Sequence, residues 1–264
     1  MKNKKTALLI ATYNWPEALN LVLKSLCVQT QMPDEILIAD DGSTSETRQL
    51  IEKYQTIIQI PIRHFWHEDL GFRKTIILNQ AISNTNCDYI IQIDGDIVMH
   101  PKFVENHTMN AKIGFYTKGS RSLLSDELTK KAISFELINF SALQRGLKNR
   151  INATYAPALA TIFRGDKYRS DNLKGCNFAF WRNDFIAVNG YNNDFIGWGH
   201  EDIELAARLT NYGIKQRQLK MTAICYHLYH KFNSRVFENP NYQYYLDSVE
   251  KHIVTCKNGI NQSF

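Results

Sequence analysis

The sequence predicts an α/β protein with a mixed, mainly parallel sheet and helices on both of its faces. Short apolar runs, which are typical of buried strands, alternate along the first hundred residues with segments whose apolar residues recur at helical spacing. Alternation in units of this length indicates a parallel sheet with crossover helices. Polar or acidic residues follow three of the runs directly, and sheets of this kind bind ligands at the carboxyl ends of their strands. The pattern therefore predicts a single cleft at those ends.

The elements can be assigned in chain order. Pro16 suits the first turn of a helix, and Asn14 is placed to cap that helix. We interpret residues 1–264 as a single domain in which residues 1–100 form the first half. The expected elements of this half are a strand at 6–12, a helix at 18–26, a strand at 35–39, a helix at 46–54, a strand at 57–63, a helix at 76–82 and a strand at 89–93.

The character of the sequence changes between about residues 126 and 174, within the second half at 101–264. Apolar residues such as Leu128 and Ala132 are interspersed with basic residues such as Lys130 and Arg145. We expect an amphipathic, basic helical insertion that packs on the sheet. The functional alternative is a face that contacts a membrane peripherally or receives a lipid-linked acceptor.

Composition limits the classes of function. A net charge of +5 is only mildly basic, the basic residues are dispersed and no recognition motif is present, so no nucleic-acid partner is expected. No glycine-rich phosphate loop follows the first strand, which argues against a dinucleotide or ATP site of the usual kind. No segment approaches the roughly 20 apolar residues that span a bilayer. The five scattered cysteines indicate reduced thiols, so we expect a cytoplasmic protein, either free or at the inner face of the membrane.

Asp94 and Asp96 flank Gly95 directly after the apolar run at 89–93. The end of a buried strand would bring these two carboxylates into one small volume, where their like charges repel. A divalent cation is the usual compensation for such a pair. Asp-X-Asp alone also fits a solvated strand end, so the remaining motifs must decide between the two interpretations.

A second motif, Gly197-Trp198-Gly199-His200-Glu201-Asp202, precedes a helical pattern. Acidic residues are favoured in the first turn of any helix, which accounts for Glu201 and Asp202 but not for the tryptophan before them. Glycines on both sides would leave the indole face of Trp198 uncovered, as a sugar-stacking platform requires.

The chain resembles glycosyltransferase family 2 enzymes with the GT-A fold, a Rossmann-like architecture. Its C-terminal part is similar to the acceptor region of β-1,4-galactosyltransferases and chondroitin polymerase domains. The motifs that carry the resemblance lie in order between residues 6 and 232 and are Ala11-Thr12-Tyr13-Asn14, Asp40-Asp41-Gly42-Ser43, Gly71-Phe72-Arg73, Asp94-Gly95-Asp96, Gly175-Cys176-Asn177, Gly197-Trp198-Gly199-His200-Glu201-Asp202 and His227-Leu228-Tyr229-His230.

The resemblance implies a donor site for a UDP-sugar with Mn²⁺, or Mg²⁺, on its diphosphate. Asp96 corresponds to the direct metal ligand, and Asp94 to the residue that reaches the ribose. His227 or His230 corresponds to the C-terminal metal ligand, and imidazole is a suitable Mn²⁺ partner beside a carboxylate. Histidine occupies both places here, which leaves the number of histidine ligands open. The remaining donor-side positions that match are Thr12, Tyr13, Asp40, Asp41 and Arg73.

The resemblance also implies an acceptor site. Asp202 corresponds to the catalytic base, with Glu201 beside it for the acceptor hydroxyls. From its glycine neighbours we expect the ring of Trp198 to form one wall of the cleft, against either the acceptor or the donor sugar. Attack by an acceptor hydroxyl needs a carboxylate to take its proton, and departure of UDP needs a cation on the phosphates.

The expected function is therefore inverting, metal-dependent transfer of a hexose or N-acetylhexosamine from a UDP-sugar to a saccharide acceptor, in surface polysaccharide or glycolipid synthesis. One alternative is a nucleotide-sugar-binding module without catalysis. Another is a sugar nucleotidyltransferase, which would need a glycine-rich, basic loop after the first strand. The segment Thr12-Tyr13-Asn14-Trp15 is not such a loop.

Overall fold

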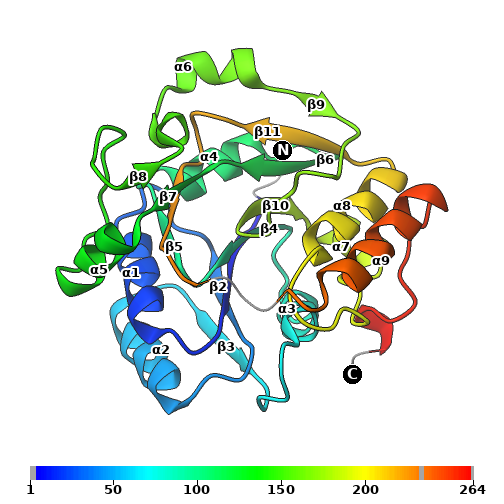
Figure 1. Cartoon of the computed structure of the whole chain (residues 1–264), viewed down its shortest axis with the longest axis horizontal. Helices are drawn as coiled ribbons and strands as arrows, with labels where there is room; N and C mark the ends of the chain where they lie inside the picture. Colours follow the sequence, from blue (N-terminus) through cyan, green and yellow to red (C-terminus); the bar gives the residue numbers. More distant parts are fainter. Residues whose placement is uncertain (1–3, 232–234, 263–264) are drawn as a thin grey trace.

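The structure is a computed structural model that describes residues 4–231 and 235–262. Within these residues a large sheet of eight strands runs through the centre of the molecule (Figure 1). Its strands are β1 Thr6–Thr12, β2 Glu35–Asp40, β3 Ile62–Trp66, β4 Tyr89–Asp94, β6 Phe115–Gly119, β9 Asp166–Lys167, β10 Asn177–Trp181 and β11 Lys215–Leu219. Their order is β3-β2-β1-β4-β10-β6-β11-β9. The first four pair in parallel, whereas β10 is antiparallel to β4 and β6, so the predicted mixed, mainly parallel sheet is confirmed.

Helices cover both faces of this sheet, as the alternation along β1 requires. Leu8 and Ile10 pack with apolar residues of α1, α2 and α4, whereas Ala7 and Leu9 pack with those of α3, α7 and α8. Both sets are fully buried, because strand side chains alternate between the faces. The helices are α1 Pro16–Cys27, α2 Ser45–Ile57, α3 Lys74–Ser83, α4 Phe103–Asn110, α5 Asp126–Ser134, α6 Pro157–Ala160, α7 Arg182–Ala187, α8 Glu201–Asn211 and α9 Glu238–Glu250.

A second, smaller sheet positions the residues that follow β4. Its strands are β5 Ile97–Met99, β7 Arg121–Leu124, β8 Leu147–Lys148 and β12 Cys225–His227, in the order β5-β12-β7-β8. The antiparallel register of β5 and β12 sets Ile97 opposite His227. The backbone N–H of Leu228 also donates to the carbonyl oxygen of Asp96 at 3.0 Å. The small sheet therefore brings a segment from the C-terminal half directly against the acidic motif.

Two local predictions in the first half are wrong. The strand expected at 57–63 begins only at Ile62, because Ile58 continues the buried face of α2 and its N–H donates to the carbonyl oxygen of Tyr54 at 2.9 Å. Asn14 is not the cap of α1, where Trp15 occupies that position. The side-chain oxygen of Asn14 instead accepts a hydrogen bond of 2.9 Å from the N–H of Thr44, which ties the two strand-end loops together.

The segment at 126–174 contains a helix longer than one turn only at α5 among the described residues. That helix is amphipathic as expected, and Leu128 and Ala132 pack in an apolar cluster beneath the small sheet. Beyond it, Glu136 has a positive φ of 51°, and the chain continues through short helical turns and strands. The expected helical insertion is therefore mostly irregular structure. No helix in the described residues has the length and apolarity that crossing a membrane would need.

Candidate active site

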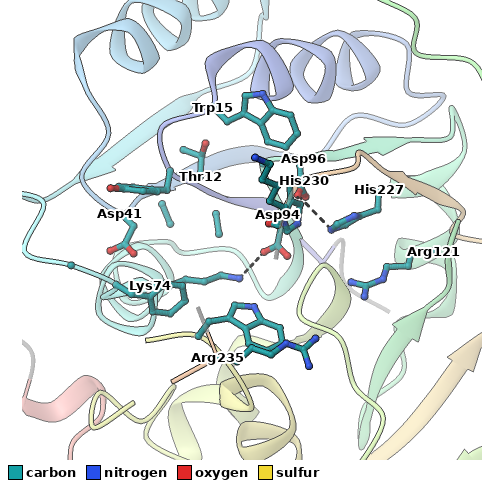
Figure 2. A pocket seen from close by; sticks show the side chains of 18 residues that line it. Thr12, Trp15, Asp41, Lys74, Asp94, Asp96, Arg121, His227, His230 and Arg235 are labelled. Atoms are coloured by element: carbon teal, nitrogen blue, oxygen red, sulfur yellow. Dashed lines mark hydrogen bonds and ion pairs between the residues drawn. The ribbon is translucent and has the colours of Figure 1, made fainter. Parts of the chain in front are cut away.

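A cleft of about 520 Å³ opens at the carboxyl ends of β1, β2 and β4 (Figure 2). Segments from the C-terminal half close its other side, so residues far apart in the sequence meet there. The sequence-predicted residues in its wall are Thr12, Tyr13, Asp41, Asp94, Asp96, Trp198, His227 and His230. The convergence of the three strand-end motifs on one cleft is thus confirmed.

Gly95 allows β1 and the acidic motif to approach each other closely. Its N–H donates to the carbonyl oxygen of Ala11 at 2.7 Å, and a Cβ at this position would lie 2.9 Å from the Thr12 hydroxyl oxygen. Any larger residue would push the two strand ends apart. The glycine therefore fixes the position of Asp94 and Asp96 at the base of the cleft.

Asp96, His227 and His230 form a cluster whose possible ligand atoms all lie within 4.8 Å of one another. Nε2 of each histidine lies 3.4 Å from Oδ2 of Asp96 (Figure 2). The other carboxylate oxygen, Oδ1, is buried without a hydrogen-bond partner. Burial and the neighbouring charge of Asp94 raise the pKa of Asp96, and burial lowers the pKa of His227. An unpartnered carboxylate oxygen beside two imidazoles is a donor set that suits a divalent transition metal.

Lys74 neutralises the other aspartate, and the sequence reasoning missed it. Its Nζ donates to Oδ1 of Asp94 at 2.7 Å (Figure 2) and lies 4.0 Å from Oε1 of Glu201. Burial alone would lower the pKa of Lys74, but these two carboxylates more than offset it, so the pKa is raised. The available signal was its place as the first residue of α3, directly after the Gly71-Phe72-Arg73 motif.

Of the remaining donor-side predictions, Asp41 lines the cleft but Asp40 and Arg73 do not. Asp40 is fully buried, and its carboxylate accepts from the Ser43 N–H at 2.8 Å and pairs with His64 at 2.9 Å. Asp40 therefore holds its loop rather than facing a ligand. The Arg73 backbone N–H donates to Asp41, while its guanidinium donates to the carbonyl of Glu68. The neighbouring Lys74, and not Arg73, belongs to the wall of the cleft.

Aromatic rings line two sides of the cleft. Tyr13 is half exposed, and its hydroxyl donates to Oδ2 of Asp69 at 2.8 Å. Trp198 is 36% exposed and the guanidinium of Arg235 lies 5.7 Å from its ring centre. Gly197 has a φ of 68°, and a Cβ there would meet the Phe237 ring at 2.6 Å. The glycine beside Trp198 is thus required by the turn and by this contact.

The predicted catalytic residues lie at the first turn of α8. Asp202 accepts hydrogen bonds from the N–H groups of Gly175 at 3.0 Å and Ile203 at 2.8 Å. Glu201 is largely buried, and burial together with the charge of Asp202 raises its pKa to about 7. Neither residue belongs to the wall of the 520 Å³ cleft, but Glu201 is connected to it through Lys74 and Asp94.

Two sequence families match this chain. Residues 7–165 match the model described as glycosyl transferase family 2, and residues 161–231 match the model described as the N-terminal domain of galactosyltransferase. Chondroitin synthase of Escherichia coli is 22% identical over 242 residues, which are 84% of this chain and 34% of that protein. Validoxylamine A glucosyltransferase of Streptomyces hygroscopicus subsp. limoneus is 26% identical over 236 residues, which are 79% of this chain and 48% of that protein. The chain thus spans about a third to a half of these relatives.

Solved structures share the fold at low sequence identity. GalNAc-T7, determined with UDP, GalNAc and Mn²⁺, has a TM-score of 0.67 at 14% identity, over 94% of this chain and 48% of that one. A mannosyltransferase from Pyrobaculum calidifontis, determined with GDP-Man and Mn²⁺, has a TM-score of 0.58 at 14% identity, over 85% of this chain and 56% of that one. At such identities the comparison establishes the architecture.

Proposed function

We propose that this chain, which belongs to glycosyltransferase family 2 and has the GT-A fold, transfers a hexose or N-acetylhexosamine from a UDP-sugar to a hydroxyl of a saccharide acceptor, with inversion. The resemblance stated from its motifs is confirmed by the family match. Polysaccharide synthesis is the setting that the chondroitin synthase similarity supports. A lipid-linked acceptor, peripheral membrane contact and a cytoplasmic location stay predictions.

The observation that carries the proposal is the buried, unpartnered Oδ1 of Asp96 beside His227 and His230. These three residues would hold Mn²⁺ or Mg²⁺, which when bound neutralises the charge of a departing diphosphate. Asp94 would bind the ribose, and its carboxylate is held in place and neutralised by the ammonium group of Lys74. Thr12, Tyr13 and Asp41 line the same cleft and would hold the uridine.

On the acceptor side, Asp202 would take the proton of the attacking hydroxyl. Its hydrogen bonds to Gly175 and Ile203 fix the orientation of the carboxylate at the start of α8. Glu201, whose pKa of about 7 keeps it partly protonated at neutral pH, can donate a hydrogen bond to an acceptor oxygen. Trp198 offers an apolar ring face for sugar stacking.

Turnover distinguishes this proposal from its two alternatives. The protein would be incubated with UDP-glucose, UDP-galactose and their N-acetylated forms, with GDP-mannose as the control donor, in Mn²⁺ or EDTA. We expect Mn²⁺-dependent UDP release from one UDP-sugar and a loss of about 10² to 10⁴ in rate in Asp202→Asn. A binding module would bind UDP without turnover, and a nucleotidyltransferase would release pyrophosphate from UTP and a sugar phosphate. If Asp202→Asn turns over at the parent rate, Glu201 becomes the candidate base.

A further inference from the structure

A second cavity of about 460 Å³ lies beside the donor cleft and is not part of the donor site described above. It is formed where β6 and β11 end, where the chain enters β10, and by a single helical turn at Arg150–Ala153. Arg121, at the start of β7, belongs to the walls of both cavities and therefore marks the point where they meet (Figure 2). Its guanidinium donates to the buried thiol sulfur of Cys176 at 3.0 Å, which holds it at this junction.

The second cavity also adjoins the candidate base. Lys174 and Cys176 line it, and Gly175 between them donates its N–H to Oδ2 of Asp202 at 3.0 Å. A Cβ on Gly175 would lie 3.6 Å from Cβ of Asp202, so this strand entry and the first turn of α8 are in direct contact. An acceptor whose hydroxyl reaches Asp202 can therefore extend into this cavity.

The cavity wall is strongly cationic. It contains Lys118, Arg121, Lys174 and Lys220 and no acidic residue. In the described part of the chain, none of these four forms an ion pair with a carboxylate. Burial, followed by repulsion from Arg169 and Lys174, lowers the pKa of Lys118 to about 8. Several cations without a direct ion-pair partner around one cavity favour an anionic occupant.

The uncharged residues of the cavity wall also suit an anionic sugar. Asn149, Asn152 and Gln218 provide amide groups suited to sugar hydroxyls, and Phe163 contributes the aromatic ring. Nζ of Lys220 lies over that ring, 4.9 Å from its centre. The only aromatic ring among the described residues that line this cavity is thus already in contact with a cation.

We infer that the second cavity is the acceptor subsite and that the acceptor sugar bound there carries an anionic group, either a carboxylate or a phosphate. The inference rests on the proposed function, because it assigns the acceptor of the same transfer reaction. Charge-assisted hydrogen bonds from lysine and arginine recognise both groups.

Binding of matched sugars to the full chain tests the inference. UDP is titrated first with Mn²⁺; failure at this step contradicts the proposed function itself. With UDP and metal present, D-glucuronate, D-glucose 6-phosphate and D-glucose are then titrated. We expect one of the anionic sugars to bind at least about tenfold more tightly than glucose, since a hydrogen bond to a charged group is typically worth more than a neutral one. The carboxylate and phosphate arms identify which anion is preferred.

Charge removal at the cavity locates the site. Lys174→Gln with Lys220→Gln should abolish the preference for the anionic sugar and leave UDP affinity unchanged. The control, Lys53→Gln with Lys257→Gln, removes the same charge from exposed positions outside the cavity wall and should keep the preference. Equal binding of charged and neutral sugars, or an unchanged preference in the cavity variant, would overturn the inference. A loss of UDP affinity in that variant would instead assign the cavity to the donor.

Discussion

The two aspartates on either side of Gly95 are in different electrostatic situations although they are two residues apart. Asp94 is paired with the ammonium of Lys74, and although burial opposes it, this pairing lowers the pKa of Asp94. Asp96 has only two imidazoles near one oxygen and no partner for the other. Asp94 is thus compensated by a cation of the protein, whereas Asp96 would be compensated by the proposed metal ion.

Replacing Lys74 tests this division. Lys74→Met leaves the Asp94 carboxylate without its cation in a largely buried site, and we expect a loss of up to about 3 kcal/mol in the free energy of unfolding, because the pair is partly exposed. Lys74→Met with Asp94→Asn should recover part of that loss, since no unpaired charge remains. Urea denaturation of the two variants and the parent measures both. Additive losses in the double variant would show that the two residues do not interact.

The raised pKa of Glu201 predicts how the free energy of unfolding depends on pH. Its folded-state pKa is about 7, because burial and the charge of Asp202 disfavour ionisation. An unfolded glutamate titrates at about pH 4.3. Between these values the folded protein binds a proton that the unfolded chain has released, so the stabilisation is present at low pH and declines as pH rises towards 7. Glu201→Gln removes this titration. Its free energy of unfolding should therefore improve relative to the parent from pH 5 to pH 7 and then level off; a pH-independent difference would contradict the raised pKa.

Replacing Trp198 should affect binding of the acceptor but not binding of UDP. The ring lines the cleft and is about one-third exposed, so Trp198→Ala should raise the acceptor KM or abolish transfer while metal-dependent UDP affinity is retained. A core tryptophan would instead cost about 3 to 5 kcal/mol on truncation. Melting curves recorded beside acceptor kinetics distinguish the two cases. Normal acceptor kinetics in a folded variant would exclude the proposed contact.

At the scale of elements, helix α8 is held by a buried ion pair. Arg208 makes two hydrogen bonds of 2.7 Å to the carboxylate of Glu204, four residues earlier, and also donates to the carbonyls of Val188 and Gly190. Ser248 of α9 donates to the same carboxylate at 3.0 Å. These contacts fix the helix whose first turn carries the candidate base.

Arg208→Met should therefore destabilise the protein by about 3 to 5 kcal/mol, because Glu204 would remain buried without its cation. Lys251, the C-cap residue of α9, is the matched control, since it pairs with Asp247 at the same spacing but on the surface. Lys251→Met should leave the denaturation midpoint unchanged. Guanidinium denaturation of both variants checks the prediction, and an unaltered midpoint in Arg208→Met would contradict it.

Strands that end in the cleft could be predicted from the sequence, whereas their neighbours could not. Runs such as 6–12 and 89–94 are largely apolar on both faces and bounded by polar residues. The residues next to each strand are therefore enough to show where it begins and ends. The start of β3 could not be predicted in this way. Ile58 lies in an apolar run that is typical of a strand, but it is the C-cap residue of α2 and its N–H donates to the carbonyl oxygen of Tyr54. Phe135 and Leu143 belong to the expected apolar pattern of the insertion, yet both are exposed, so the pattern there did not indicate burial.

At the scale of the whole molecule, the candidate site depends on contacts that no local pattern contains. The motifs at 94–96 and 227–230 meet because β12 pairs with β5, and the sequence showed the motifs but not this pairing. Only the resemblance to a family predicted that these two motifs belong to one metal site. Lys74 and Arg121 were missed for the same reason, since each acts on residues distant in the chain.

Calorimetry of UDP binding tests the central claim that Asp96, His227 and His230 hold a metal under a nucleotide diphosphate. The account predicts that UDP binds the parent protein in Mn²⁺ but not in EDTA, and that Asp96→Ala loses the Mn²⁺-dependent binding while remaining folded. Asp126→Ala, an exposed aspartate on α5, is the control and should bind UDP like the parent. Equal UDP affinity in Mn²⁺ and EDTA, or unchanged metal dependence in Asp96→Ala, would contradict the account.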